Sequence, residues 1–346
     1  MKKITNKILF VTPYYPPNIG GVQNYVYNLA HGMSKKDDCK VVVVTSQNTS
    51  NKIQIERGKK LTVYRMPTLF KFFNTPINPL WYFHIKEIIK NEKPDIINAH
   101  SPVPFMADMA ALSSNSTPFI LTYHSGPMEK YKYFVDKIIN VYERFFLQYT
   151  FKKANKIICS SNFVKRTMLK KYKTKSIIIH PAVDTKIFKP SKFKKIPNSV
   201  LFIGRKSNYE LKGLFYLINA IKQIPEVTLY IVGGKIENHD KNVIFVGEKK
   251  TSELIKIIQS SSVLVLPSLA QTESFGMVLI EAMACKTSVI GTHIGGIPEV
   301  INNNIDGLLV RSRDSKKLKE AIEKILHNKK FATKLSENGY KKVTNY

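Results

Sequence analysis

Two cations and two carboxylates in the second half of the chain have the types and spacing that phosphate and sugar chemistry requires. Glu273 and Glu281 lie eight positions apart, after the apolar stretch Val263 to Leu266. Upstream, Arg205 and Lys212 follow another apolar stretch. Arginine can donate hydrogen bonds to two phosphate oxygens at once, and lysine supplies a point charge. These two cations therefore predict a diphosphate clamp. The alternative interpretation is two solvated cations in a lysine-rich chain and a chance pair of glutamates.

A helix is predicted to begin near Phe275, directly after Glu273, with Glu281 in its second turn. The first backbone N–H groups of a helix have no partner inside it, and the helix dipole favours an anion there. The amides of Phe275, Gly276 and Met277 are therefore predicted to bind a phosphate, which a glycine lets approach closely. A carboxylate at this place can also serve only to complement the dipole.

The first half of the chain offers a glycine loop and two histidines. Gly20 and Gly21 stand between a predicted strand and its helix, where backbone amides contact phosphates; a tight turn is the alternative. The loop is neither the Gly-x-Gly-x-x-Gly fingerprint of nicotinamide enzymes nor a P-loop. His100 and His124 each end a predicted strand, and a structural role is their alternative. The sequence has no His-x-x-x-His pair and no Asp-x-Asp, so we expect chemistry without a metal.

Strand-sized apolar runs alternate with stretches of helical period along the chain, and these elements must position the residues above. The pattern predicts an α/β fold with two tandem doubly wound, Rossmann-like domains facing a central cleft. Residues 1–185 form the first domain, 186–198 a linker rich in lysine and proline, and 199–346 the second. The predicted strands cover residues 7–11, 41–45, 61–65, 95–99, 119–123, 156–159, 176–179, 199–203, 228–232, 243–246, 263–266 and 288–290. Ligands of such sheets bind at the carboxyl ends of the strands, so we expect the site in that cleft.

Composition narrows the class of protein further. The 346 residues are 43% hydrophobic, enough for two cores, and no apolar run approaches the roughly 20 residues that span a bilayer. The apolar stretch near the start is too short for a signal peptide, which predicts a cytoplasmic protein. Three scattered cysteines predict no disulfide and no cysteine zinc site, and each is expected to be buried.

The net charge of +29 suggests an anionic partner. Nucleic acid, an anionic membrane surface and anionic substrates all fit, and biased base composition is the plain alternative. The first 190 residues carry 30 basic and 11 acidic residues, a net +19, against +10 in the rest. The excess of positive charge is therefore larger in the first domain than in the second.

Two segments combine aromatic with basic residues. Residues 130–156 carry eight aromatic residues among lysines, which suits a long interfacial helix at a membrane. We favour the alternative, an ordinary amphipathic helix packed on its sheet. A second patch consists of Phe70, Lys71, Phe72, Phe73 and Trp81, and it is either core or membrane-facing.

Together these residues resemble the retaining family 4 glycosyltransferases, also called group 1 glycosyltransferases, which have the two-domain GT-B fold. The resemblance covers nearly the whole chain and rests on motifs that occur in the same order. They are the Pro-Pro loop with Gly20-Gly21, Pro94 to His100, Thr122 to His124, Ile178 to Asp184, Gly204-Arg205 with Lys212-Gly213, Glu273 to Glu281, and Gly295 to Glu299.

The resemblance implies that the second domain binds a nucleoside-diphosphate sugar as co-substrate. Arg205 and Lys212 would hold the diphosphate, and Glu281 would bind the ribose hydroxyls. Glu273 would hold the donor sugar near its anomeric carbon. The amides of Phe275 to Met277 would add donors to the diphosphate.

The resemblance also implies roles for the first domain, which would bind the acceptor. The Gly20-Gly21 loop would reach the donor phosphates, and His124 would contact the donor sugar. Transfer would proceed with retention, without metal or other cofactor. A glycan or a lipid-linked hydroxyl acceptor is expected, and the positive first half favours an anionic or lipid-linked one at the inner face of the cell membrane.

Three departures from the family pattern qualify these expectations. The interval from Arg205 to Lys212 is longer than in many members, which weakens their pairing on one diphosphate. Ala182 stands where glycine is common. The chain ends about where members continue into a helix that crosses back onto the first domain. Either the sequence is truncated or that helix is absent, and we expect a looser hinge between the domains than in a longer chain.

Other functions stay open on the sequence alone. A nucleotide-sugar epimerase of the same fold would form an epimer without an acceptor. A basic nucleic-acid-binding protein is disfavoured because the aromatic residues fall in helical core registers rather than on an exposed sheet. A sugar-nucleotide binder without activity is the third alternative.

Overall fold

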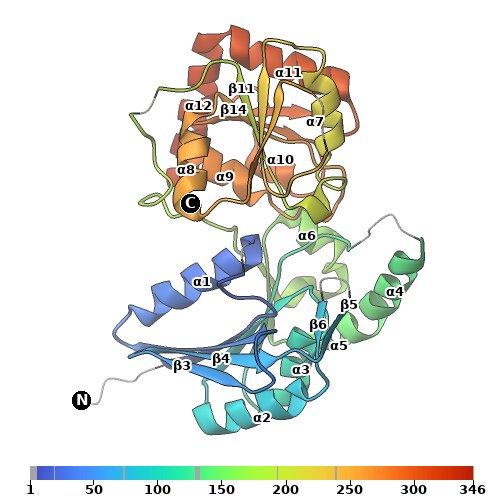
Figure 1. The fold of residues 1–346 in the computed structure, drawn as a ribbon. Coiled ribbons are helices and arrows are strands. Elements are labelled where there is room, and N and C mark those ends of the chain that lie inside the picture. Colours follow the sequence, from blue (N-terminus) through green and yellow to red (C-terminus); the bar gives the residue numbers. More distant parts are fainter. Residues whose placement is uncertain are drawn as a thin grey trace. The chain divides into compact units, whose positions relative to one another are not determined.

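The protein is described by a computed structural model that covers residues 6–18, 20–72, 75–128, 133–192, 194–237 and 240–345. The chain divides into two compact units. Unit 1 holds Met1–Ser160 and Val164–Ile179, and unit 2 holds Ser161–Phe163 and His180–Tyr346. Each unit is a mostly parallel sheet covered by helices (Figure 1), so the predicted α/β fold is confirmed.

The described part of unit 1 is built on an eight-stranded sheet in the order β10-β9-β8-β7-β1-β2-β4-β3. Its strands are β1 (Asn6–Val11), β2 (Cys39–Gln47), β3 (Gln54–Arg57), β4 (Leu61–Pro67), β7 (Ile96–Ser101), β8 (Phe119–Tyr123), β9 (Lys156–Cys159) and β10 (Ser176–Ile178). Among these strands, β3 at the edge alone pairs antiparallel, with β4. A small separate hairpin joins β5 (Phe70–Phe72) to β6 (Thr75–Ile77).

Helices cover both faces of this sheet. Figure 1 shows α1 on one side and α2 and α3 on the other. The helices are α1 (Gly21–Ser34), α2 (Trp81–Glu92), α3 (Met106–Ser113), α4 (Tyr133–Arg144), α5 (Phe146–Lys153) and α6 (Asn162–Thr167), and a 3₁₀ segment covers Lys170–Lys175. The first residues of α6 belong to unit 2.

Unit 2 holds a six-stranded parallel sheet in the order β13-β12-β11-β14-β15-β16. Its strands are β11 (Ser199–Ile203), β12 (Thr228–Val232), β13 (Val243–Gly247), β14 (Val263–Leu266), β15 (Ser288–Thr292) and β16 (Leu308–Val310). Its helices are α7 (Leu214–Ile221), α8 (Thr251–Ser260), α9 (Met277–Ala284), α10 (Ile297–Val300), α11 (Ser315–His327) and α12 (Lys329–Thr344), with a 3₁₀ turn at Lys206–Asn208.

The core of unit 2 follows from strand alternation, because successive side chains point to opposite faces. Val200 and Phe202 pack with residues of α7 and α11, whereas Leu201 between them packs with residues of α8 and α9. All three side chains are fully buried. Burial of each such side chain contributes roughly 1.5–3 kcal/mol, so both faces of the sheet hold the unit together.

The structure corrects two expectations about elements. The strands predicted from apolar runs are all present, but β3, β5, β6 and β16 were missed because they are short or exposed. The long helix predicted across residues 130–156 is two helices, α4 and α5, which break at Phe145; residues 130–132 lie outside the described residues. Phe145, between the two helices, has φ −112° and ψ −66°.

The second aromatic patch separates into core and surface. Trp81 is fully buried and its indole N–H donates to the carbonyl oxygen of Pro67 at 2.9 Å. Phe70 and Phe72 are exposed, and Phe73 lies outside the described residues. The three cysteines are buried and free, as predicted.

None of the helices in the described ranges combines the length and the apolar character needed to cross a membrane.

Candidate active site

The loop after β14 places Glu273 beside Lys212 in unit 2. The Nζ atom of Lys212 lies 3.5 Å from Oε2 of Glu273. The hydroxyl of Ser268 donates to the same carboxylate oxygen at 3.2 Å. Both charged side chains are mostly buried, with 22% and 19% of their surface exposed. Because a sheltered ion pair is screened less than a surface pair, this contact fixes both side chains.

Two adjacent glycines, Gly295 and Gly296, pack closely against the backbone of the loop that carries Glu273. A Cβ atom on Gly295 would lie 2.1 Å from the carbonyl oxygen of Glu273, and one on Gly296 would lie 2.0 Å from that of Ser274. The N–H of Gly296 donates to the carbonyl oxygen of Glu273 at 2.9 Å. No side chain fits at either glycine, so the glycine pair is a structural requirement of the loop that presents Glu273.

The residues from Arg205 to Lys212 fold into a compact turn that includes the 3₁₀ segment. Gly213 follows in the left-handed region, with φ 70°, and a Cβ there would lie 2.0 Å from the carbonyl oxygen of Pro267. The backbone next to Lys212 is thereby packed against the loop that carries Glu273. Arg205 is exposed, and within the described residues the ion pair found with Glu273 is that of Lys212.

Glu281 lies in the second turn of α9, as predicted, in a partly buried position. Burial raises the pKa of its carboxyl from 4.5 to about 7, and the charge of Lys212 acts in the opposite direction. A carboxyl with this pKa changes charge near neutral pH, and its oxygens suit hydroxyl groups as hydrogen-bond partners. Lys212 thus interacts electrostatically with both glutamates that the sequence singles out.

Helix α9 begins at Met277, two residues later than the sequence predicts. Gly276 precedes it with φ 95°, a left-handed conformation that ends the loop and delays the helix. Phe275 is buried, and its ring lies 5.4 Å from the ring of His180. Of the three predicted phosphate-binding amides, that of Met277 therefore belongs to the helix, and the other two belong to the loop.

The two histidines of unit 1 form a pair. The Nδ1 atom of His100 lies 2.9 Å from Nε2 of His124, and the rings are nearly parallel. Burial lowers the pKa of both imidazoles, to about 4 for His124, and the neighbouring His124 lowers the pKa of His100 further. Both imidazoles are therefore neutral at pH 7, and one donates an N–H to the other. The ring of Tyr25 meets both edge-on.

Gly20 and Gly21 lie at the start of α1, and Ile19 before them lies outside the described residues. Gly20 has an extended backbone, with φ 161°. A Cβ atom on Gly21 would meet no atom within 4 Å. A tight turn that needs positive φ therefore does not explain Gly21, and the space beside its backbone is open to a ligand atom.

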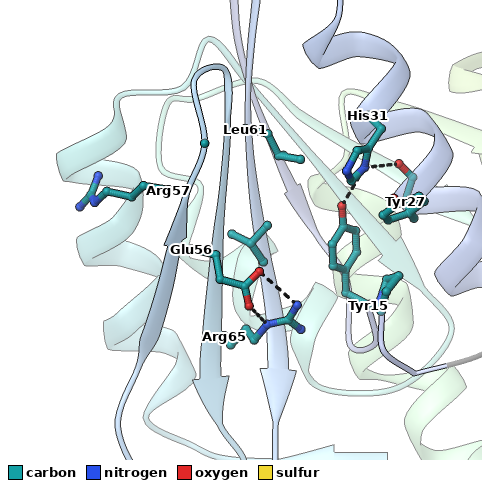
Figure 2. A pocket seen from close by; sticks show the side chains of 10 residues that line it. Tyr15, Tyr27, His31, Glu56, Arg57, Leu61 and Arg65 are labelled. Atoms are coloured by element: carbon teal, nitrogen blue, oxygen red, sulfur yellow. Dashed lines mark hydrogen bonds and ion pairs between the residues drawn. The ribbon is translucent and has the colours of Figure 1, made fainter.

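A pocket of about 340 Å³ opens between the loop after β1, helix α1 and the hairpin of β3 and β4 (Figure 2). Arg65 and Glu56 pair with each other on the hairpin wall, with Nε 2.5 Å from Oε1, whereas Figure 2 shows Arg57 pointing away from that pair. His31 contacts the hydroxyl of Tyr15 at 3.4 Å. The pocket thus combines the rings of Tyr15 and Tyr27 with a carboxylate, a guanidinium and an imidazole. This combination suits a sugar or polyol, which offers both apolar faces and hydroxyls.

Several site residues were missed from the sequence. Ser268, Tyr25 and pocket residues such as Arg65 have no motif that marks them, and only spatial contact identifies them. The Gly295-Gly296 pair was noted as part of a family motif, but its contact with the Glu273 loop was not predicted; two adjacent glycines after a predicted strand indicate a close backbone approach. Within the described residues, no group of three or more His, Cys, Asp or Glu side chains is arranged to hold a metal ion.

Comparison with known proteins connects both units to sugar transfer. Residues 183–342 match the family described as glycosyl transferases group 1, and residues 19–187 match the family described as glycosyltransferase family 4. An uncharacterized glycosyltransferase of Methanocaldococcus jannaschii is 30% identical, over 97% of this chain and 93% of the relative. A chain of the human phosphatidylinositol N-acetylglucosaminyltransferase is 26% identical, over 95% of this chain and 70% of the relative.

Solved structures share the fold. Sucrose-phosphate synthase from Thermosynechococcus elongatus matches with a TM-score of 0.78 at 20% identity, covering 99% of this chain and 94% of that one. HepE from Anabaena, solved in complex with UDP-glucose, matches with a TM-score of 0.75 at 18% identity, covering 98% and 94%. Both likenesses span the two units, so the fold is that of the two-domain GT-B enzymes.

Proposed function

Because the chain belongs to the group 1 glycosyltransferases, we propose that it transfers a sugar from a nucleoside diphosphate to a hydroxyl of a glycan or lipid-linked acceptor. The proposal includes retention of the anomeric configuration and independence from metal ions. The observation that carries it is the cluster in unit 2, where one sheltered lysine interacts with two glutamates.

The chemical task explains why this cluster suits the donor. When the glycosidic bond to the diphosphate breaks, negative charge grows on the departing phosphate oxygens. Lys212 offers a cation whose position is already fixed by Glu273, and Arg205 offers an exposed guanidinium on the same turn. Fixed charges stabilise a developing anion without reorganising during the reaction, which is the part a metal plays elsewhere.

The remaining residues complete the donor site in this proposal. Glu281 accepts hydrogen bonds from the ribose hydroxyls, and Glu273 from hydroxyls of the donor sugar. The amide of Met277 and the loop amides before it face the diphosphate. From unit 1, the neutral imidazole of His124 contacts the donor sugar and the open backbone at Gly21 admits a phosphate oxygen.

We assign acceptor binding to unit 1, with the pocket beside Tyr15 and Arg65 as a subsite for a sugar or polyol of the acceptor. The excess positive charge of the first 190 residues supports an anionic acceptor. The phosphatidylinositol named for the human relative supports a lipid-linked one. The enzyme would then work as a peripheral protein at the anionic inner face of the cell membrane.

The deciding experiment is a thermal-shift panel of UDP, GDP, ADP and their common sugar conjugates, with NAD as the control. A ligand that binds only the folded protein raises the melting temperature by mass action. We expect one nucleotide family to stabilise the protein in EDTA as well as in magnesium, and Glu281→Ala to abolish the shift. UDP is the first candidate, because HepE was solved with UDP-glucose.

Product analysis then separates the alternatives. NMR of the product formed with the stabilising donor and a polyprenyl phosphate or phosphatidylinositol acceptor reports the anomeric configuration. An inverted product contradicts retention, and an epimerised donor without transfer indicates an epimerase. No shift with any nucleotide, together with salt-sensitive RNA or DNA binding, contradicts the proposal as a whole.

A further inference from the structure

The outer side of α4 and α5 carries large apolar side chains that face solvent. Four of them recur at helical spacing along α4 and its end, and a helix packed on a core would turn such a row inward. The exposed fraction reaches 72% at Phe134 and 62% at Phe145. This α4–α5 stripe consists of Phe134, Ile138, Val141, Phe145, Phe146 and Tyr149.

Both helices are also tied to the rest of unit 1 by side chains outside the stripe. The hydroxyls of Tyr142 on α4 and Thr150 on α5 both donate to the buried carboxyl of Asp108 on α3. Leu147 and Phe151 of α5 are fully buried. Helix α5 therefore already has a packed inner face, and Tyr142 ties α4 to the same carboxyl, so the stripe is an additional apolar face.

Positive charge surrounds the stripe. Residues 133–175 contain eleven Lys and Arg residues against two acidic residues, a net charge of +9. The 3₁₀ segment Lys170–Lys175 packs beside α5, because the hydroxyl of Tyr172 donates to the Gln148 side chain at 3.0 Å and its ring lies 5.4 Å from that of Phe151. Lysines 170, 171 and 173 of this segment are exposed.

We propose that the α4–α5 stripe and the lysines of Lys170–Lys175 dock unit 1 onto an anionic lipid bilayer. Apolar rings at the acyl boundary and cations at the headgroups are the two contributions that hold a helix in a membrane interface. A second copy of this chain fits less well, since two faces of net charge +9 repel each other. The inference deepens the proposed function and rests on it for the lipid-linked acceptor that the surface would bring within reach.

The test is co-sedimentation of the full chain with vesicles of phosphatidylcholine, with and without roughly one quarter phosphatidylglycerol. We expect the wild type to bind the anionic vesicles and to release them at high salt. The variant Phe134→Ser/Val141→Ser/Phe145→Ser should bind at least about tenfold more weakly. Its matched control is Phe215→Ser, an aromatic residue of unit 2 that is 49% exposed.

A second variant keeps the stripe and removes the charge. Lys170→Glu/Lys171→Glu/Lys173→Glu should lose the preference for anionic vesicles, because each lysine near the surface contributes roughly fivefold in affinity. The control carries the same change at three exposed lysines of α12, Lys329, Lys330 and Lys334. Melting temperatures of all variants establish that each is folded.

Wild-type affinity in both triple variants, or no binding by the wild type, overturns the proposal. So does a wild-type dimer that ignores vesicles and becomes a monomer in the serine variant, because the stripe would then bind a second copy. Nucleotide thermal shifts on the same samples separate the two hypotheses. A shift without vesicle binding refutes only the docking surface, and vesicle binding without any shift refutes only the transferase.

Discussion

At the scale of single residues, Lys212 is the centre of the candidate site, because it pairs with Glu273 and lowers the cost of charging Glu281. Lys212→Ala should reduce transfer at least about 100-fold, as loss of one donor to a developing anion does. The control Lys222→Ala removes an exposed lysine of the same unit and should leave the rate unchanged. Equal steady-state rates of the two variants would refute the role of Lys212.

Glu281 links protonation to stability. Its native pKa of about 7 lies above the unfolded value near 4.5, so the native state holds the proton more tightly and stability falls as pH rises from about 4.5 to 7. Glu281→Gln removes the charge without removing the hydrogen-bonding shape. We expect its melting temperature to exceed that of the wild type by roughly 7 °C or more at pH 8 and to differ little from it near pH 4.5. A constant difference across pH would contradict the shifted pKa.

His124 gives the opposite pH dependence. Its native pKa of about 4 lies below the unfolded value near 6.5. Between these two pH values the unfolded chain therefore binds a proton that the buried imidazole does not bind. Stability should therefore fall as pH drops from about 6.5 toward 4, by up to about 2 kcal/mol at pH 5. Urea unfolding at pH 7.5 and pH 5 measures this, and the loss should shrink in His124→Gln. An unchanged loss in that variant would assign the effect to other groups.

At the scale of elements, the loop from Ser268 to Gly276 depends on backbone contacts that only glycine allows. Gly296→Ala places a methyl group 2.0 Å from a carbonyl oxygen, so we expect a loss of several degrees in melting temperature and weaker donor binding. Gly32→Ala, in the exposed part of α1 with open space around it, should stabilise by up to about 1 kcal/mol. Calorimetry on both variants decides, and equal effects would refute the steric account.

Gly21→Ala tests whether the open space beside the backbone of Gly21 receives part of the donor. A methyl group there meets no protein atom, so folding stability should be unchanged or slightly higher. If a donor phosphate approaches this backbone, the same methyl group should raise the KM for the donor about tenfold or more. An unaltered KM would leave Gly21 with no part in donor binding.

The strands and their order along the chain were readable from the sequence because a parallel sheet buried on both faces produces continuous apolar runs. Val263 to Leu266 and Phe119 to Tyr123 were predicted with their observed ends. The exposed edge strand Gln54–Arg57 has no such run, since its pairing with β4 rather than burial makes it a strand. The start of α9 was misplaced because the left-handed φ of Gly276 is a property of the folded loop.

The candidate site was likewise only partly predictable from the sequence. That Lys212 and Glu273 lie close together could be predicted, because charged residues after apolar runs fall at the carboxyl ends of strands. The bond between His100 and His124 could not, because it depends on which neighbouring strands pair in register. Likewise, the outward direction of the α4–α5 stripe depends on the contacts of Asp108, which no periodicity records.

At the scale of the whole molecule, the two units have separate cores and should respond separately to ligands. Hydrogen exchange on the full chain with a stabilising nucleotide should protect peptides of unit 2 around residues 205–213 and 268–284 most strongly. Anionic vesicles should instead protect peptides within residues 133–175. Protection by the nucleotide confined to unit 1 would contradict the assignment of the donor to unit 2.

The contact between Gly295-Gly296 and the backbone of Glu273 and Ser274 has a consequence for protein engineering. The two loops are about twenty residues apart in sequence, yet each defines the space available to the other. A chimaera that imports the Glu273 loop from a relative while keeping its own glycine loop risks a mismatch between two backbones. Exchanges intended to change the donor should therefore move residues 267–276 and 293–297 together, as one cassette.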